Sequence, residues 1–195
     1  MEREARLREK LISQLRRSGA LHSERVAAAL SRVPRHRFVP ASSPEEAYAD
    51  QAIALKLAAG EVISSVSQPS MLAQMLELLD AEPGDRILEI GTGSGYNAAL
   101  LAELAGEGGA VTTVELDPEL ARFARRALAE LGYARVRTVL GDGGEPLGEP
   151  GAYDRIVVSA RCEDVARAWW EALPEGGRLV VPLRLEGAGE FAVGF

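Results

Sequence analysis

One short stretch of the chain, residues 87–97, combines an acid with closely spaced glycines. Glu89 lies inside an apolar run typical of a buried strand, and glycines at positions 91, 93 and 95 follow directly. Glycines allow backbone conformations that other residues avoid, and they let a ligand approach the main chain. The helical pattern that follows, residues 98–105, would point its unpaired N–H groups at that ligand. The stretch therefore predicts strand, tight turn and helix around a ligand that carries negative charge.

The spacing of the glycines narrows the choice of ligand. Gly91 and Gly93 fit the dinucleotide pattern G-x-G-x-x-G, but its third position is occupied by Tyr96, and the last glycine comes early, at Gly95. A phosphate-binding P-loop needs a lysine after its glycines, and none follows here. The pattern E-x-G-x-G-x-G after a strand is instead typical of enzymes that bind S-adenosylmethionine, which has a carboxylate and no phosphate. We therefore expect S-adenosylmethionine as the cofactor and S-adenosylhomocysteine as its product.

The predicted strands that follow end in residues suited to the rest of such a ligand. The second strand pattern ends in Glu115, whose carboxylate can accept hydrogen bonds from both ribose hydroxyls. Asp142 follows the third and could accept one from an adenine amino group, although a plain turn aspartate explains it equally well. Ser159 and Ala160 end the fourth. Open α/β sheets bind ligands at the carboxyl ends of their strands, so we expect these residues to meet.

A second candidate stretch, residues 63–71, is rich in hydroxyl groups and directly precedes a helical pattern. Pro69 suits the first turn of that helix, and Ser67 or Gln68 suits its N-cap. Helix capping alone explains the stretch in one interpretation. In the other, its serines and N–H groups hold a carboxylate near the ligand. The residues alone do not decide between the two.

The composition limits the classes of function. The net charge of −7 argues against a nucleic-acid partner held mainly through phosphate contacts. Cys162 is the only cysteine, which excludes an internal disulfide and a cysteine-rich zinc site, and we expect no metal. The charged N-terminus lacks an apolar signal region, and no apolar run reaches membrane-spanning length. We therefore expect a cytoplasmic protein with no membrane partner.

From residue 82 onward, strand and helix patterns alternate, which predicts an α/β fold with a doubly wound, mostly parallel sheet. The preceding part begins with two predicted helices, residues 2–17 and 24–31, the second capped by Ser23. Residues 33–40 lie between two prolines and are expected to be an extended connector. Its Arg35, His36 and Arg37 are expected to be solvated charges of a packed connector, or else to contact an acidic peptide or the ligand. We divide the single domain into residues 1–80, on the substrate side, and the cofactor-binding core, residues 81–195.

With these stretches placed, the sequence resembles the protein-L-isoaspartate O-methyltransferase family over about residues 23–185. The glycine motif is shared by all related methyltransferases, whereas the Val-Pro-Arg-His and Ser-Gln-Pro motifs are more specific to this family. The resemblance implies a Rossmann-like methyltransferase fold that esterifies an L-isoaspartyl carboxylate in a damaged protein. The matching segments are residues 32–40, 47–50, 66–71, 88–95, 141–143, 153–156 and 176–180.

The resemblance also implies a role for each part of the site. Ser67 matches the active-site serine that lies beside the substrate carboxylate and the methyl donor. Glu89 begins the methionine-binding turn, Glu115 matches the ribose-binding acid, and Asp142 with Gly143 lies near the adenine. The complete cofactor set is Glu89, Gly91, Thr92, Gly93, Ser94, Glu115, Leu116, Asp142 and Gly143, and the substrate set beside Ser67 is Ser65, Val66, Gln68, Ser159 and Ala160.

The sequence also departs from the family in ways that leave alternatives open. Residues 159–164 replace an alanine-rich segment that contacts the substrate backbone in relatives, and Cys162 there is either a passive residue or part of the cleft. The chain ends soon after the fifth predicted strand, without the further strand we expect from relatives. Residues 64–70 resemble a branch that methylates an aspartate of a ribosomally made precursor peptide. The alternatives are thus a peptide-tailoring enzyme and a non-catalytic binding domain, and a monomer is expected.

Overall fold

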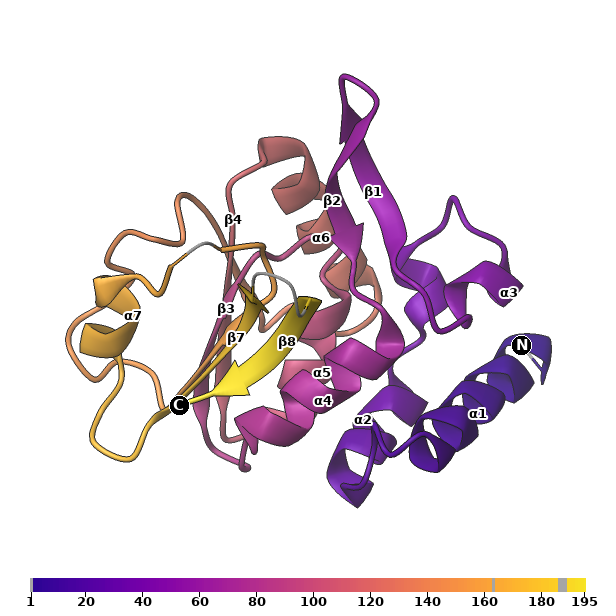
Figure 1. The fold of residues 1–195 in the computed structure, drawn as a ribbon, viewed down its shortest axis with the longest axis horizontal. Helices are drawn as coiled ribbons and strands as arrows, with labels where there is room; N and C mark the ends of the chain where they lie inside the picture. Colours follow the sequence, from indigo (N-terminus) through magenta and orange to yellow (C-terminus); the bar gives the residue numbers. More distant parts are fainter. Residues whose placement is uncertain (1, 163, 186–188) are drawn as a thin grey trace.

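A computed structural model describes residues 2–162, 164–185 and 189–195 of the chain. Its centre is a six-stranded sheet with the strand order β5-β4-β3-β6-β7-β8 (Figure 1). Five strands are parallel, and only β8 runs antiparallel to its neighbour β7. The α/β fold expected from the alternating patterns is confirmed. The strands are β3 (Arg86–Ile90), β4 (Ala110–Glu115), β5 (Arg137–Leu140), β6 (Arg155–Val158), β7 (Arg178–Leu185) and β8 (Gly189–Gly194).

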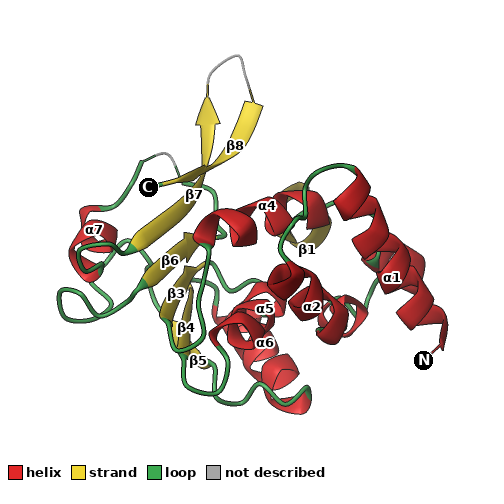
Figure 2. Cartoon of the chain, turned by 90° about the horizontal axis from the view of Figure 1, so that it is seen from below, coloured by secondary structure: helices red, strands yellow, loops and turns green. Residues whose placement is uncertain are grey.

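Helices cover the two faces of this sheet unequally. Figure 2 shows α4, α5 and α6 on one face and the short α7 on the other. Both faces are buried, so strand residues of either parity are apolar: Ile87 belongs to the core under the three helices, and Leu88 to the core under α7. The helices are α4 (Pro69–Leu79), α5 (Tyr96–Ala105), α6 (Pro118–Glu130) and α7 (Arg167–Ala172).

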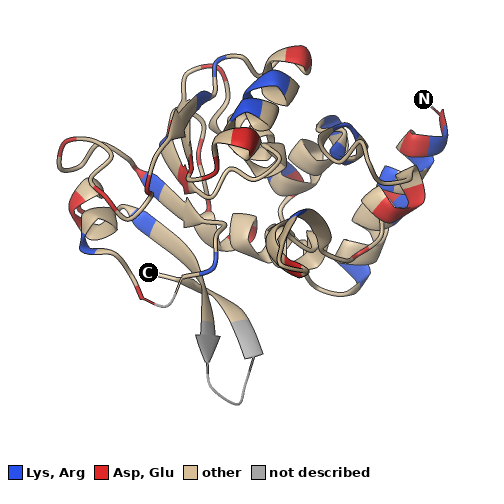
Figure 3. Ribbon diagram, turned by 90° about the horizontal axis from the view of Figure 1, so that it is seen from above, with Lys and Arg blue, Asp and Glu red and all other residues tan. Residues whose placement is uncertain are grey.

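The N-terminal part packs beside this three-helix face and presents a hairpin toward the sheet's carboxyl edge (Figure 1). Its first helix carries both acidic and basic side chains, in keeping with a solvated face (Figure 3). Ser23 caps the second helix as expected, because its side chain accepts a hydrogen bond from the Val26 N–H. The elements are α1 (Glu2–Arg17), α2 (Glu24–Arg32), the 3-10 helix η1 (Arg35–Phe38), α3 (Pro44–Ala47), β1 (Ile53–Ala58) and β2 (Glu61–Val66).

Two expectations about this part are corrected by the structure. Residues 33–40 are not extended throughout, because η1 forms inside them. Arg35 is not solvated: its side chain is fully buried, and backbone carbonyls accept its hydrogen bonds. The hairpin of β1 and β2 was not predicted at all, and its turn places Ala59 at φ 51° and Gly60 at φ 86°. A non-glycine residue at positive φ is uncommon, so no familiar turn pattern marked this turn.

The C-terminal end also differs from expectation. Residues that were expected to follow the fifth predicted strand as an apolar end segment form β8, which pairs with β7 from Gly194 opposite Val180 to Gly189 opposite Leu185. This strand supplies the antiparallel edge of the sheet. No helix within the described residues combines the length and the apolar character needed to cross a membrane. The division of the chain at residue 80 stays a prediction.

Candidate functional site

The carboxyl ends of four neighbouring strands open into one cavity of about 660 Å³. Its apolar floor comes from the last residues of the strands, Ile90, Val114 and Val158. On the side of α7, Trp169 of this helix forms part of the cavity wall. Five of the residues predicted to bind the cofactor line it, together with one residue predicted for the substrate: Gly91, Glu115, Leu116, Asp142, Gly143 and Ala160.

A second, much smaller gap of about 30 Å³ lies between the serine stretch and the glycine turn. Gly91 lines both this gap and the larger cavity, so the two spaces adjoin. The gap has room for about one water molecule. Gln68 is exposed and lines neither space, which separates it from the rest of the predicted set. The predicted residues that share this gap are Ser65, Val66, Ser67, Glu89, Gly91, Thr92, Gly93, Ser94 and Ser159.

Glu89 lies at the bottom of the small gap and is completely buried. Its carboxylate accepts hydrogen bonds from Thr113 Oγ1 at 2.6 Å, Asn97 Nδ2 at 2.8 Å and Ser159 Oγ at 3.2 Å. Burial raises the pKa of Glu89 to about 7, although these three hydrogen bonds act in the opposite direction. The side chain is therefore a buried acid with neutral hydrogen-bond partners, and a cationic group beside it would favour its ionised form.

Sequence reasoning missed Thr113 and Asn97. Thr113 lies directly opposite Glu89 in the parallel register of β3 and β4, and it also contacts Thr92 Oγ1 at 2.6 Å. Aligning the two strand patterns would have been the only way to find it. Asn97 occupies the first turn of α5, and its Oδ1 atom is buried with no hydrogen-bond partner among the described residues. Because Asn97 lines the small gap, this oxygen is an acceptor available to a ligand there.

The glycine turn is held in place by Glu115 and by close packing. Glu115 accepts hydrogen bonds from the Gly93 N–H at 2.8 Å and from the Asp117 N–H at 3.0 Å. Gly91 has a φ of 92°, and a Cβ atom there would lie 2.9 Å from the Cβ and N atoms of Ala160. The position therefore accepts only glycine, for conformational and for steric reasons. Carboxylate oxygens have several acceptor positions, so Glu115 retains capacity for a ligand hydroxyl.

The far wall of the cavity is built around Gly143. A Cβ atom at this position would collide with Ile90 Cγ2, so the loop can approach the strand this closely only with glycine. The Gly143 carbonyl accepts a hydrogen bond from Trp169 Nε1 at 2.7 Å, a role that the sequence did not reveal. Asp142 Oδ1 accepts a bond from the Gly144 N–H, which makes it a turn aspartate whose carboxylate also lines the cavity.

The segment that departs from the family motif, residues 159–164, forms part of the same wall. Cys162 lines the cavity. Glu163, in the same segment, lies outside the described residues. Within the described ranges, no group of three or more His, Cys, Asp and Glu side chains could hold a metal ion. The polar groups that line the two spaces are carboxylates, hydroxyls, one side-chain amide, the backbone of a glycine turn and, in the larger cavity, the guanidinium groups of Arg161 and Arg167.

Known proteins are similar to this chain in sequence and in fold over most of its length. The family model described as protein-L-isoaspartate(D-aspartate) O-methyltransferase (PCMT) matches residues 5–193. A protein-L-isoaspartate O-methyltransferase of Methanopyrus kandleri is 45% identical over 179 residues, covering 91% of this chain and 77% of that protein. One of Aeropyrum pernix is 46% identical over 182 residues, covering 93% and 67%.

Solved structures agree. A structure named protein-L-isoaspartate O-methyltransferase superposes with a TM-score of 0.83 at 36% identity over 96% of this chain. This chain spans 59% of the length of that structure. A putative protein-L-isoaspartate O-methyltransferase from Plasmodium falciparum, in complex with S-adenosyl-L-homocysteine, has a TM-score of 0.77 at 20% identity, covering 94% of this chain and 87% of that one, and supports the fold alone. The chain therefore belongs to the protein-L-isoaspartate(D-aspartate) O-methyltransferase family.

Proposed function

We propose that this protein is an S-adenosylmethionine-dependent carboxyl methyltransferase that esterifies L-isoaspartyl residues in damaged proteins or peptides. Family membership supports the reaction, and one arrangement in the structure supports the site. That arrangement is the small gap, where Ser65 to Ser67 face the glycine turn that starts at Gly91. A methyl donor on the turn and a carboxylate beside the serines would meet there.

The residues present fit S-adenosylmethionine. The larger cavity combines an apolar floor with the acids Glu115 and Asp142, which suits an adenosine with hydroxyl and amino donors. At the other end, Glu89 and the unpartnered Asn97 Oδ1 are two acceptors with no cation among their described partners. They fit the ammonium of the methionine part. The cofactor would supply an electrophilic methyl group on a sulfonium.

The chain's own residues then have a positioning task. The substrate carboxylate is already ionised at neutral pH, so the reaction needs no general base. Ser67 lines the gap, and its hydroxyl would orient that carboxylate. Holding the reacting atoms in line can contribute several kcal/mol to lowering the barrier. Val66, buried beside Ser67, gives the gap an apolar wall, which would favour a dry reaction site.

The alternatives raised by the sequence gain no support from these relatives, which carry the name of the isoaspartyl enzyme. Tailoring of a precursor peptide and a non-catalytic binding role therefore rank below the repair reaction. A monomeric state, a cytoplasmic location and the absence of nucleic-acid or membrane partners remain predictions. The assignments of Ser67, Glu115 and Asp142 are part of the proposal, because they depend on a ligand that lies across the two adjoining spaces.

A matched pair of peptides tests the proposal. The protein is given labelled S-adenosylmethionine with an isoaspartyl peptide or its aspartyl counterpart, and we expect base-labile methyl ester on the isoaspartyl peptide alone. Ser67→Ala should lower kcat on the order of 10-fold while S-adenosylhomocysteine still binds, since one oriented hydrogen bond is removed. Glu115→Ala should weaken that binding by about 10- to 100-fold. Ester on neither peptide with the wild-type protein would contradict the repair function, and equal behaviour of both variants would contradict the site.

A further inference from the structure

The turn that carries Ser67 is held from two sides by residues distant in sequence. Arg35 Nη2 donates a hydrogen bond to the carbonyl of Ser67 at 2.9 Å. Asp50 Oδ1 accepts one from the N–H of Ser70 at 2.8 Å. The two hydrogen bonds fix the turn on either side of Pro69, which begins α4 and has no N–H of its own. The orientation of the turn is thus set by side chains outside it.

Arg35 connects this turn to the cofactor side of the site. Its Nε donates to the carbonyl of Ala47 at 2.9 Å, and its guanidinium lies 5.0 Å from the ring centre of Tyr96. Tyr96 is the first residue of α5, directly after the glycine turn. Burial lowers the pKa of Arg35, and Tyr96 and Asp50 act in the opposite direction. A buried guanidinium costs several kcal/mol to desolvate, and here Nε and Nη2 donate to carbonyls whereas Nη1 is buried with no hydrogen-bond partner among the described residues. The planar group thus bridges three segments of the chain.

Asp50 supplies the hydrogen bond to the first turn of α4 that the N-cap residue of this helix does not supply. Gln68 occupies the N-cap position of this helix but makes no side-chain capping bond. The carboxylate of Asp50 instead binds an N–H of the first helical turn, where the helix dipole also favours negative charge. The serine turn therefore enters α4 at an angle that depends on Asp50.

We infer that Arg35 and Asp50 are positioning residues that form a clamp, which fixes Ser67 at its distance from the glycine turn. This inference rests on the proposed function in that Ser67 is taken as the residue beside the substrate carboxylate. It gives one physical reason for three separate motifs, residues 32–40, 47–50 and 66–71. Each of them contributes a group to the clamp or the turn that it holds. Neither positioning residue lines the small gap: Asp50 acts through the turn that carries Ser67, and Arg35 acts through that turn and through Tyr96, which lines the gap.

The test compares variants that break the clamp with matched controls. Asp50→Ala removes the acceptor for the Ser70 N–H, and Asp50→Asn keeps an oxygen in its place. Arg35→Met removes the guanidinium, and Arg37→Met removes an exposed arginine of the same 3-10 helix. Thermal unfolding first shows which variants are folded. Each folded variant is then measured for S-adenosylhomocysteine affinity by calorimetry, for kcat and KM with the isoaspartyl peptide, and for amide hydrogen exchange over residues 67–71.

For Asp50→Ala and Arg35→Met we expect kcat to fall on the order of 10- to 100-fold, since small misplacements of reacting groups have effects of this size. Affinity for S-adenosylhomocysteine should stay within about 2-fold, because the hydrogen bonds of the cofactor groups remain. Asp50→Asn should recover most of kcat, and Arg37→Met should match the wild type. The Ser70 amide should exchange at least about 10-fold faster in Asp50→Ala than in Asp50→Asn.

Unchanged kcat in the folded Asp50→Ala protein would overturn the clamp. So would a parallel loss of kcat and cofactor affinity, which would indicate general distortion of the site. Hydrogen exchange decides the matter even if the wild-type protein fails to methylate the peptide. In that case the proposed function is wrong, whereas faster exchange confined to residues 67–71 still supports the clamp and unchanged exchange overturns it.

Discussion

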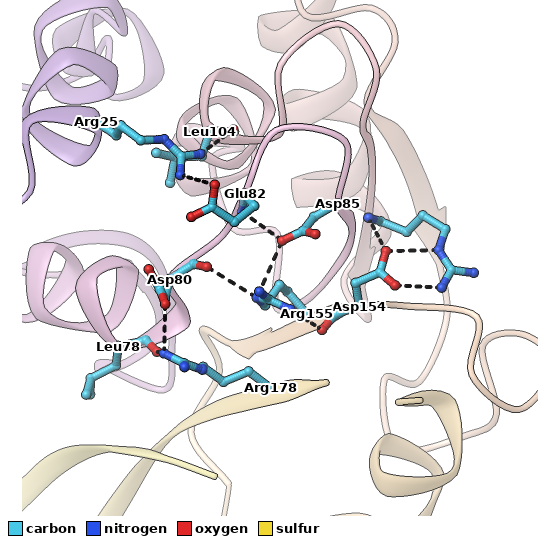
Figure 4. A network of polar contacts seen from close by, with 10 residues as sticks. Arg25, Leu78, Asp80, Glu82, Asp85, Leu104, Asp154, Arg155 and Arg178 are labelled. Carbon is cyan, nitrogen blue, oxygen red and sulfur yellow. Dashed lines mark hydrogen bonds and ion pairs between the residues drawn. The ribbon is translucent and has the colours of Figure 1, made fainter. Parts of the chain in front are cut away.

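Charged side chains have different partners at the two ends of the same parallel strands. At their amino ends, arginines at the first positions of three neighbouring strands pair with aspartates from nearby turns and helix ends (Figure 4). At their carboxyl ends the strands give way to glycines, hydroxyls and acids around the adjoining spaces. The amino-end pairs are Arg86 with Asp154, Arg155 with Asp85, and Arg178 with Asp80.

Two carboxylates show the difference most clearly. The pKa of Asp154 is lowered, chiefly because the Arg86 guanidinium donates two hydrogen bonds to it. The pKa of Glu89 is raised to about 7, because the side chain is buried and only neutral groups donate to it. The amino end thus satisfies its charges within the chain. The carboxyl end holds a buried acid and, at Asn97, an unpartnered acceptor, which a bound cation would satisfy.

The largest effect is expected from the two glycines that flank β3. Gly84 before the strand and Gly91 after it have φ values of 97° and 92°. Gly84→Ala places its Cβ in open space, so it should cost only the backbone strain of about 1 kcal/mol. Gly91→Ala adds the clash with Ala160, so its total cost should be on the order of 3 kcal/mol. Urea unfolding measures both costs.

Binding of S-adenosylhomocysteine sharpens this comparison. We expect Gly84→Ala to leave the affinity unchanged and Gly91→Ala to abolish detectable binding, because only Gly91 lines the adjoining spaces. Equal losses of stability in the two variants would show that backbone strain, and not the close approach of Ala160, governs the glycine turn.

The second prediction uses the raised pKa of Glu89. Its pKa is about 7 in the folded protein and near 4.5 when unperturbed. Between these values the folded state keeps a proton that the unfolded state has released, so stability falls as pH rises from about 4.5 to 7. The total loss from this group is on the order of 3 kcal/mol, and it is complete above pH 7. Glu89→Gln cannot titrate and should not show this loss.

Urea unfolding of both proteins from pH 5 to pH 8 measures the effect. The stability of the wild type relative to Glu89→Gln should decline up to about pH 7 and then level off. A constant offset, from the changed hydrogen bonds to Asn97 and Thr113, does not affect this slope. Parallel curves would mean that Glu89 stays ionised throughout the range, and the contrast with Asp154 would then disappear.

Local sequence patterns were enough to predict turns and helix caps, because each of these depends on a few neighbouring residues. The glycine turn and the cap at Ser23 are of this kind. The residues predicted for the two sides of the site came together in adjoining spaces, since parallel strands bring their carboxyl ends to one edge.

What the sequence did not reveal depends on contacts between distant segments. The sequence predicts a solvated charge at Arg35, because arginines are seldom buried. Its burial depends on carbonyls that are distant in sequence, those of Ala47 and Ser67. Thr113 faces Glu89 through the register of two strands, which the single-strand patterns leave undetermined. The hairpin of β1 and β2 has the usual glycine at the second position of its turn, but alanine at the first, where asparagine, aspartate or glycine would mark such a turn.

The smallest effects are expected at the amino ends, where two arginines differ in exposure. The Arg155 side chain is 16% exposed; it pairs with Asp85 at 3.4 Å and donates to the carbonyl of Asp154 at 3.0 Å. The Arg178 side chain is 42% exposed, and its partner Asp80 is 62% exposed. Arg155→Met should therefore cost about 1–2 kcal/mol of unfolding free energy, whereas Arg178→Met should cost less than about 1 kcal/mol.

Neither change should alter kcat or the affinity for S-adenosylhomocysteine, since both side chains lie at the opposite edge from the adjoining spaces. Urea unfolding at low and high salt separates the two variants, because screening reduces the contribution of the exposed Arg178 pair more than that of the largely buried Arg155 pair. A loss of cofactor affinity in Arg155→Met would contradict the separation of roles, because it would mean that β6 transmits strain from its first residue to Ser159 at its far end.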